Sequence, residues 1–204
     1  MLCYTAVMTP INLIVDKATS YRPRKIWWRR IASRSAVAAV LDHRTELNEP
    51  AVLLMQRAIR QGDPWSGHIS FPGGRAEAQD NHVYETAVRE TYEEIGLNLI
   101  THGVDVGRLS DLAARPPSWK RRPMLITPFI FQLQQEPQWH LDPKEVASVF
   151  WVPLSFLADH NNRETMSWER GGITLNLPCY FYQEHRIWGL TLRMLDELIS
   201  VIYP

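Results

Sequence analysis

The stretch FPGGRAEAQDNHVYETAVRETYEEIGL, Phe71–Leu97, carries the strongest pattern in this sequence. Its segment Pro72–Gly74 predicts a turn, and the polar residues that follow predict a loop. Apolar residues then recur at helical spacing, which predicts a helix over Val83–Ile95. Gly96 comes directly after that helix and suits the left-handed conformation with which many helices end. The stretch therefore predicts a turn, a loop and a capped helix.

Three glutamates of this helix, Glu90, Glu93 and Glu94, are spaced so that they are neighbours on its surface. Like charges at that spacing repel one another, and a divalent cation removes the repulsion. Carboxylate oxygens suit Mg²⁺ or Mn²⁺, which keep several waters and also bind substrate phosphates. Arg89 would brace the acids from one side, and Gly74 would let the backbone come close to metal or phosphate. The whole pattern favours a metal site over a solvated acidic helix, which a glutamate-rich stretch more often forms.

Short apolar runs on both sides of this stretch predict strands. The runs are Ser35–His43, Ala51–Ala58, His68–Phe71, Leu125–Leu133 and Val146–Leu154. The pair Gly171-Gly172 predicts a hairpin turn, and Gly189–Ile202 predicts a closing amphipathic helix. Many strands with few, separate helices indicate an α+β layered domain. We expect this domain to cover residues 35–204, after an N-terminal extension over residues 1–34.

The composition is that of an ordinary globular protein, with 45% hydrophobic and 22% charged residues. Lys plus Arg and Asp plus Glu are equal at 22 each, which argues against a nucleic-acid partner. No window is apolar and long enough to span a bilayer, so no membrane partner is expected. The two cysteines, Cys3 and Cys179, are too few for a disulfide framework and are consistent with a cytoplasmic protein. A homodimer is compatible with the sequence, which does not determine the oligomeric state.

Several other features have both a functional and a structural interpretation. The basic run Arg22–Arg30 could bind phosphate or a membrane surface, but we expect its tryptophans to pack on the domain. The proline-rich loop Arg115–Pro123 fits a lid or phosphate clamp as well as it fits a solvated loop. Trp65 and Trp119 could stack on a base, although packing is the commoner role of such residues. For His68 we expect a structural role.

Residues 89–97, RETYEEIGL, resemble the end of the box of the Nudix hydrolase family, Arg-Glu-aliphatic-x-Glu-Glu-x-Gly-aliphatic. The resemblance implies a Nudix α/β/α sandwich with a mixed central sheet. It also implies Mg²⁺- or Mn²⁺-dependent hydrolysis of a small-molecule nucleoside diphosphate derivative. By this resemblance Glu90, Glu93 and Glu94 match the metal ligands, and Gly74 or its neighbour offers a carbonyl. Thr91 replaces the usual aliphatic residue, which is a mild departure.

The loop before the helix departs from the box as well. Fourteen residues lie between Gly74 and Arg89, one more than in the common box. As a result Asn81 stands where the box has its early glutamate. Either Glu77 or Asp80 is left to take the mainly structural role of that glutamate, and the sequence does not choose between them.

A longer loop and the preceding GHISFPGG, Gly67–Gly74, resemble the coenzyme A pyrophosphatase branch of the family. Leu53-Leu54, the segment Ile187–Thr191, and Glu145 leading into Val149–Leu154 resemble it too, so that the resemblance covers most of residues 35–200. The branch implies cleavage of coenzyme A or its thioesters into 3′,5′-ADP and 4′-phosphopantetheine.

The residues between Leu54 and Gly67 do not match this branch. Asp63 stands where the branch has an arginine, and Ile59 stands where it has a small polar residue. An acid in place of a phosphate-binding base argues against coenzyme A as the substrate. Arg57 or Arg60 would compensate, and together with Gly73, Gly74 and Arg75 they are the expected substrate-binding residues.

The expected reaction is attack of water on one phosphorus of a diphosphate, with Arg89, Glu93 and Glu94 as catalytic residues. The metal would neutralise charge, orient the groups and lower the pKa of a bound water. One of the glutamates or Glu145 would take the proton, although an acid before a strand is more often structural. The alternatives are hydrolysis of ADP-ribose, NADH or a nucleoside triphosphate, and a sensor that binds a nucleotide without cutting it. Nucleic-acid processing is disfavoured by the charge balance, and the three retained acids favour an enzyme over a sensor.

Overall fold

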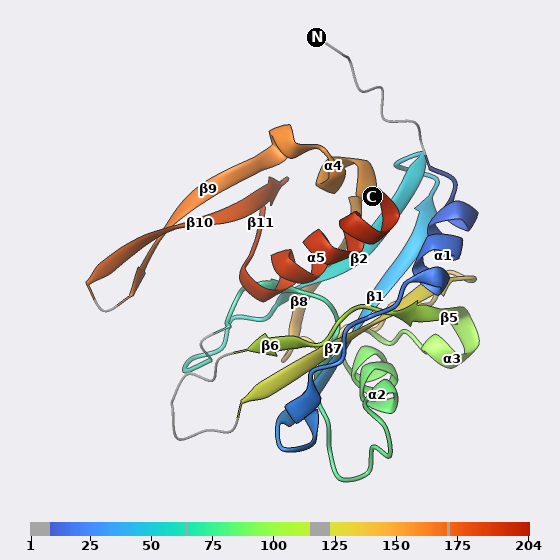
Figure 1. Cartoon of the computed structure of the whole chain (residues 1–204), viewed down its shortest axis with the longest axis horizontal. Helices are drawn as coiled ribbons and strands as arrows, with labels where there is room; N and C mark the ends of the chain where they lie inside the picture. Colours follow the sequence, from blue (N-terminus) through green and yellow to red (C-terminus); the bar gives the residue numbers. More distant parts are fainter. Residues whose placement is uncertain (1–8, 64, 115–122, 171) are drawn as a thin grey trace.

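The computed structural model describes residues 9–63, 65–114, 123–170 and 172–204. Its centre is an eight-stranded sheet in the order β3-β2-β1-β7-β5, in which β4 adds to β1, β6 to β7 and β8 to β2 (Figure 1). β1 pairs in parallel with β7 and antiparallel with β2, which makes the sheet mixed. The strands are β1 (Ser33–Arg44), β2 (Glu49–Arg57), β3 (Ile69–Ser70), β4 (Gly73–Arg75), β5 (Gly103–Arg108), β6 (Leu112–Ala114), β7 (Met124–Leu133) and β8 (Val146–Pro153).

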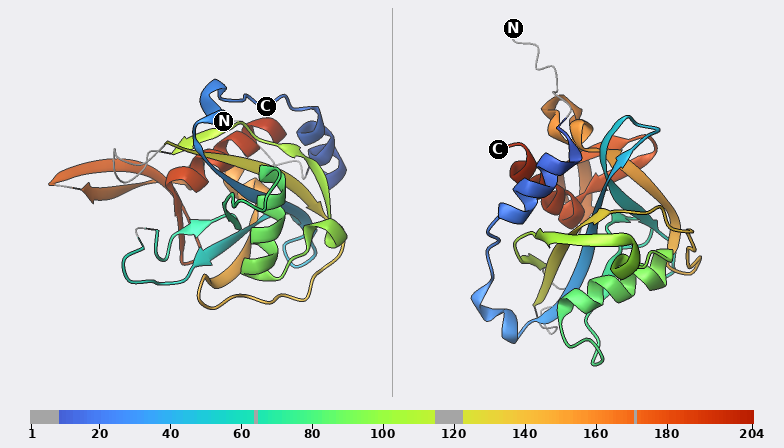
Figure 2. Two further views of the ribbon diagram at one scale, coloured as in Figure 1. Left: turned by 90° about the horizontal axis from the view of Figure 1, so that it is seen from below. Right: turned by 90° about the vertical axis from the view of Figure 1, so that its right-hand side faces the viewer.

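Helices cover both faces of this sheet, with α2 on one face and α1 and α5 on the other (Figures 1 and 2). The helices are α1 (Ile11–Ser20), α2 (Val83–Ile95), α3 (Leu99–His102), α4 (Leu154–Ala158) and α5 (Gly189–Ile202), with short 3-10 turns η1 (Trp27–Arg30) and η2 (His160–Asn162). None of the helices in the described ranges is long and apolar enough to cross a membrane.

The side chains of β1 show how the sheet separates two cores. Val37, Ala39 and Leu41 pack in the cluster that includes residues of α1 and α5, whereas Ala38 and Val40 pack in the cluster at the end of α2. Successive side chains of a strand point to opposite faces, so an unbroken apolar run is buried on both. The three layers are those of the predicted α/β/α sandwich.

A second sheet lies beside the sandwich and leads into α5. Its strands β9 (Arg163–Arg170), β10 (Ile173–Tyr182) and β11 (His185–Trp188) are antiparallel, in the order β11-β10-β9. The hairpin of β9 and β10 extends away from the body of the molecule (Figures 1 and 2). The predicted hairpin is therefore present, with Ile173 opposite Arg170 at its end.

The sequence predicted α2 and α5 with the bounds that the structure shows, and β1, β2, β7 and β8 overlap their predicted ranges. The turn predicted at Gly73-Gly74 is wrong in part, because Gly73–Arg75 form the strand β4 on β1. β5 was missed because its sequence GVDVGR holds two glycines and an aspartate, which are rare in strands. Pairing with β7 outweighs that weak local preference.

The N-terminal segment packs partly on the domain. Ile14 and Ala18 of α1 are fully or almost fully buried in the core. In η1 the side chain of Trp27 is 88% exposed, so the expectation that it packs on the domain is wrong. Arg29 forms an ion pair with the buried Asp111 at 3.8 Å, which ties η1 to the segment after β5. Cys179 is buried, whereas Cys3 lies outside the described residues.

Candidate active site

Two acids of α2, Glu90 and Glu94, face the sheet at the short strand β4. The helix is amphipathic, and it buries Thr86, Ala87, Thr91, Glu94 and Ile95. Gly96 ends it in the left-handed conformation, with φ at 75°, and its N–H donates to the carbonyl of Tyr92. A carboxylate in this otherwise uncharged buried set needs a partner, because desolvation of an unpaired charge is costly.

The partner of Glu94 is the backbone of β4. Glu94 is 2% exposed, and its Oε2 accepts a hydrogen bond of 2.7 Å from the N–H of Gly73. Burial raises the pKa of the Glu94 carboxyl to about 8. The nearby negative charge of Glu90 adds to this shift, whereas the positive charge of Arg57 opposes it. The described residues thus compensate the charged form of Glu94 only in part.

Glu90 lies against the next residue of β4. A side chain at Gly74 would overlap the Glu90 carboxylate and displace it, so the glycine allows this close approach. Oε1 of Glu90 accepts from Nη1 of Arg89 at 3.0 Å, and the Glu90 side chain is 15% exposed. Burial raises the pKa of Glu90, and the negative charges of Glu93 and Glu145 act in the same direction. The two glycines of β4 therefore bring its backbone into contact with two acids of α2.

Glu93 lies apart from this pair. Its side chain is 55% exposed, and its Oε2 accepts from Nη1 of Arg89 at 2.9 Å. Within the described ranges, no three side chains of the types His, Cys, Asp and Glu are grouped closely enough to hold a metal ion. The donor chemistry of Glu90 and Glu94 suits a hard divalent cation, since both carboxyls have raised pKa values that a cation would lower. Glu93 would join them only after leaving Arg89.

Arg89 links the helix to the loop that precedes it. Its Nε and Nη2 donate to Oδ1 and Oδ2 of Asp80 at 3.1 and 2.9 Å, and Nη2 also donates to the carbonyl of Arg75. Asp80 is almost buried, and Arg89 holds the pKa of its carboxyl well below the usual range. Of the two acids that the sequence left open, Asp80 pairs with Arg89, whereas Glu77 donates its backbone N–H to Asp80.

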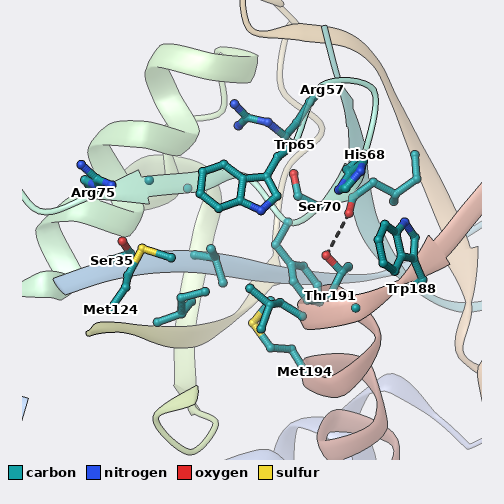
Figure 3. Close-up of a pocket in the computed structure, with 18 of the residues that line it drawn as sticks. Ser35, Arg57, Trp65, His68, Ser70, Arg75, Met124, Trp188, Thr191 and Met194 are labelled. Atoms are coloured by element: carbon teal, nitrogen blue, oxygen red, sulfur yellow. Dashed lines mark hydrogen bonds between the residues drawn. The ribbon is translucent and has the colours of Figure 1, made fainter. Parts of the chain in front are cut away.

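Gly73 and Gly74 also line a cleft of about 490 Å³ (Figure 3). The acids of α2 are not among the residues that line it. Gly73, Gly74, Arg75 and Arg57, four of the five residues expected to bind substrate, line this cleft. The rest of the wall is mostly apolar and aromatic, including Val37, Trp65, His68, Ile69, Phe71, Met124, Ile126, Trp188, Leu190 and Met194. The cleft therefore has a basic, glycine-rich part beside the acids and an apolar remainder.

The two candidate arginines, Arg57 and Arg60, have different surroundings. Nη2 of Arg57 donates to Asp63 at 2.9 Å, within the cleft wall. Arg60 is absent from that wall, and its guanidinium donates to Glu145 at 3.1 Å and to the carbonyl of Lys144. The charge of Glu145 raises the pKa of both Glu90 and Glu94, which places Glu145 in the electrostatic surroundings of the acid pair. The structure thus brings Arg57 to the cleft and couples Arg60 to Glu145.

The aromatic part of the cleft was only partly foreseen. Trp65, for which packing was expected, and His68, for which a structural role was expected, both line the cleft. The ring of His68 makes an edge contact with Trp188, with 5.0 Å between the ring centroids, and burial lowers the pKa of His68. Thr191 Oγ1 donates to the carbonyl of Ile69 at 2.8 Å, which joins the start of α5 to β3 (Figure 3). The segment Ile187–Thr191 resembles the coenzyme A pyrophosphatase branch in sequence. Nothing in the sequence beyond helical periodicity points to Met194 as a cleft residue.

Trp119 and most of the loop Arg115–Pro123, residues 115–122, lie outside the described residues. A lid or clamp there stays a prediction.

Comparisons with known proteins agree with this architecture. The family model of the NUDIX domain matches residues 32–171. Nudix hydrolase NudL of Photorhabdus laumondii is 32% identical, over 85% of this chain and 89% of the relative. Mitochondrial coenzyme A diphosphatase NUDT8 of Mus musculus is 31% identical, over 86% of this chain and 82% of the relative.

Solved structures show the same fold at low identity. A NUDIX hydrolase from Alicyclobacillus acidocaldarius superposes with a TM-score of 0.54 at 17% identity, over 83% of this chain and 91% of that chain. A MutT/nudix family protein from Enterococcus faecalis gives a TM-score of 0.52 at 17% identity, over 95% of this chain and 68% of that chain. Family model, relatives and fold agree, and the chain belongs to the Nudix family and is a pyrophosphohydrolase.

Proposed function

We propose that this pyrophosphohydrolase cleaves the diphosphate of coenzyme A or its thioesters, with Mg²⁺ or Mn²⁺ as the metal. The observation that carries the proposal is the contact of two acids, Glu90 and Glu94, with the glycine backbone that forms one wall of the cleft. The named activity of the relatives in Mus musculus and Homo sapiens, both 31% identical over 86% of this chain, supports the choice of substrate.

The cleft has the chemistry that such a substrate needs. Arg57 and Arg75 line the part next to Gly73 and Gly74, where guanidinium groups can bind phosphate oxygens. The apolar part accepts the less polar ends of the molecule, since small-molecule sites are mostly apolar with a few placed polar groups. The cleft volume of about 490 Å³ lies in the range of ligand sites.

The reaction adds one water across the P–O–P linkage, so that one product keeps the bridging oxygen and the other gains the hydroxyl. Glu90 and Glu94, with the carbonyl of Gly74, would hold the cation, and Glu93 would join after releasing Arg89. A bound divalent cation would supply charge neutralisation and a more acidic water. Glu145 is the proposed acceptor of the water proton, because its charge already acts on both acids. Arg57 and Arg75 would hold the phosphates, and positioning would contribute most of the rate.

The test is a panel assay with coenzyme A, acetyl-coenzyme A, ADP-ribose, NADH and nucleoside triphosphates. With Mg²⁺ we expect equal amounts of 3′,5′-ADP and 4′-phosphopantetheine from coenzyme A, and no products in excess chelator. Hydrolysis of another member of the panel but not of the two coenzyme A compounds would refute the substrate. Nucleotide binding without any hydrolysis would favour the sensor over the enzyme.

The role of Glu145 has its own test. Glu145→Gln should lower kcat without raising KM, because the group acts on the water and not on the bound substrate. An unchanged kcat would return Glu145 to the structural role that is more common for an acid before a strand.

A further inference from the structure

Asp63 contacts two parts of the cleft with its two carboxylate oxygens. Oδ2 accepts from Nη2 of Arg57 at 2.9 Å, and Oδ1 accepts from the backbone N–H of Trp65 at 2.9 Å. Both Arg57 and Trp65 line the cleft, and so does Asp63. The acid that stands where the related branch has an arginine thus joins a basic and an aromatic residue of the same wall.

The loop around Asp63 is closed by its own backbone. The N–H of Ser66 donates to the carbonyl of Asp63 at 3.1 Å, and the N–H of His68 donates to the carbonyl of Trp65 at 3.1 Å. The N–H of Arg57 donates to the carbonyl of His68 at 3.0 Å, which fixes the loop to the end of β2. A side chain that bridges such a loop limits the conformations of both residues that it contacts.

The guanidinium of Arg57 is only partly hydrogen-bonded to the described residues. Its Nε is buried and has no hydrogen-bond partner among the described residues, although its side chain is still 23% exposed. Its charge also lowers the pKa of Glu94, which places it in the surroundings of the acid pair. The buried Nε is out of reach of a ligand, but the exposed part of this side chain lines the cleft beside the acids and suits a phosphate oxygen.

Trp65 supplies a flat apolar surface. It is 37% exposed, and Figure 3 shows its indole extending across the cleft, with Trp188 and His68 farther along the wall. Aromatic side chains at such a site can stack on a nucleobase, at about 1–3 kcal/mol per base. The backbone position of Trp65, and therefore of this surface, depends on the bond to Asp63.

We propose that Asp63 is a positioning residue, which holds Arg57 toward a substrate phosphate and Trp65 across the cleft where a nucleobase stacks. This rests on the proposed function only in that the substrate is a nucleoside diphosphate. Where the related branch has an arginine, this chain has Asp63, which acts on the phosphate indirectly by orienting Arg57. If Asp63 instead acts only by repelling phosphate, removal of its charge in Asp63→Ala should strengthen the binding of a nucleoside diphosphate.

The test is the binding of α,β-methylene-ADP, a nucleoside diphosphate whose bridge resists hydrolysis, measured by calorimetry with Mg²⁺. Asp63→Ala should weaken binding about tenfold, or about 1.4 kcal/mol, because Arg57 and Trp65 both lose their anchor. Asp63→Asn keeps an acceptor for the Trp65 N–H and should lose less. In an Arg57→Ala background, Asp63→Ala should cost clearly less than it does in the wild type, because the Arg57 part of its effect is already gone.

Tighter or unchanged binding in Asp63→Ala would overturn the proposal, and so would full additivity with Arg57→Ala. Asp196→Ala is the matched control, since Asp196 pairs with Arg163 at 2.6 and 3.0 Å at a site outside the cleft lining. It should leave binding unchanged, and thermal unfolding should show that each variant is folded.

Steady-state kinetics on the substrate that the panel identifies give a second readout. For Asp63→Ala we expect KM to rise about tenfold and kcat to stay within about threefold, as for a lost binding contact. A loss confined to kcat would contradict the assigned role. If coenzyme A is not cleaved but methylene-ADP binding falls as described, the substrate proposal fails while the role of Asp63 stands.

Discussion

Arg89 and Arg57 lie near the same acids but have different surroundings. Their side chains are similarly exposed, at 17% and 23%. Arg89 donates to three carboxylates and a backbone carbonyl, whereas Arg57 donates to one carboxylate and keeps a buried Nε without a partner among the described residues. The side chain of Arg57 is also partly exposed where it lines the cleft, so a ligand in the cleft can reach it. The comparison separates an arginine that stabilises the fold from one that is available to a substrate.

The acids next to these arginines should show the largest effect. Glu94→Gln and Glu90→Gln keep the shape of the side chain but remove its charge. We expect turnover to fall by about a thousandfold in each, which corresponds to about 4 kcal/mol of transition-state stabilisation. For Glu93→Gln we expect a smaller loss, about a hundredfold, because its carboxylate is 55% exposed and lies apart from the pair Glu90 and Glu94. Near-normal activity of these variants at limiting Mg²⁺ would remove the metal site from the proposal.

The next largest effect is on the free energy of unfolding, which should depend more on the ion pair of Arg89 with Asp80 than on Arg57. Asp80→Asn weakens an ion pair in which the acid is 4% exposed, and we expect the free energy of unfolding to fall by about 2–4 kcal/mol. Arg57→Ala should lower it by about 1 kcal/mol or less, because it removes a single ion pair with Asp63, whose side chain is more exposed than that of Asp80. Urea unfolding at neutral pH measures both. Equal losses in the two variants would contradict the distinction drawn between Arg89 and Arg57.

The pH dependence of stability follows from Glu94. Its pKa is about 8 in the folded protein and near 4.5 when unfolded, so the folded state binds more protons between these values. The free energy of unfolding of the metal-free protein should therefore fall as pH rises from about 5 to 8, by at most about 1.4 kcal/mol per unit. Glu94→Gln should remove most of this slope, and saturating Mg²⁺ should flatten it in the wild type. A slope that persists in Glu94→Gln would assign it to another group.

How far the sequence predicts this molecule depends on whether a feature is local. The helix Val83–Ile95 and its cap at Gly96 follow from periodicity and one glycine, and the structure confirms both. The strand β4 does not follow, because Gly73 and Gly74 favour a turn and only pairing with β1 makes them a strand. The family box was recognised from residues 89–97, and the family model confirms it.

In the site too, local features follow from the sequence, whereas features that depend on contacts between distant segments do not. Helical spacing predicted that Glu90, Glu93 and Glu94 are neighbours, but it could not show that Glu94 is buried and Glu93 exposed. Sequence left Glu77 and Asp80 as equal candidates, because the choice depends on which carboxylate the loop turns toward Arg89. Sequence also treated Asp63 as a loss of phosphate binding, since its contact with Arg57 arises from the shape of the loop.

The smallest expected effect tests whether Arg57 acts through its charge or through the geometry of its donors. Arg57→Ala should raise KM about tenfold with kcat nearly unchanged, as for a contact made equally in the ground and transition states. Arg57→Lys keeps the charge but loses the planar fork, and it should recover part of that affinity, leaving KM about threefold high. Full recovery in Arg57→Lys would show that charge alone matters, and then the orientation that Asp63 gives to the guanidinium would have no consequence for binding. A KM equal to that of Arg57→Ala would instead show that the two-pronged geometry is essential, which is the arrangement that a bond from Nη2 to Asp63 maintains.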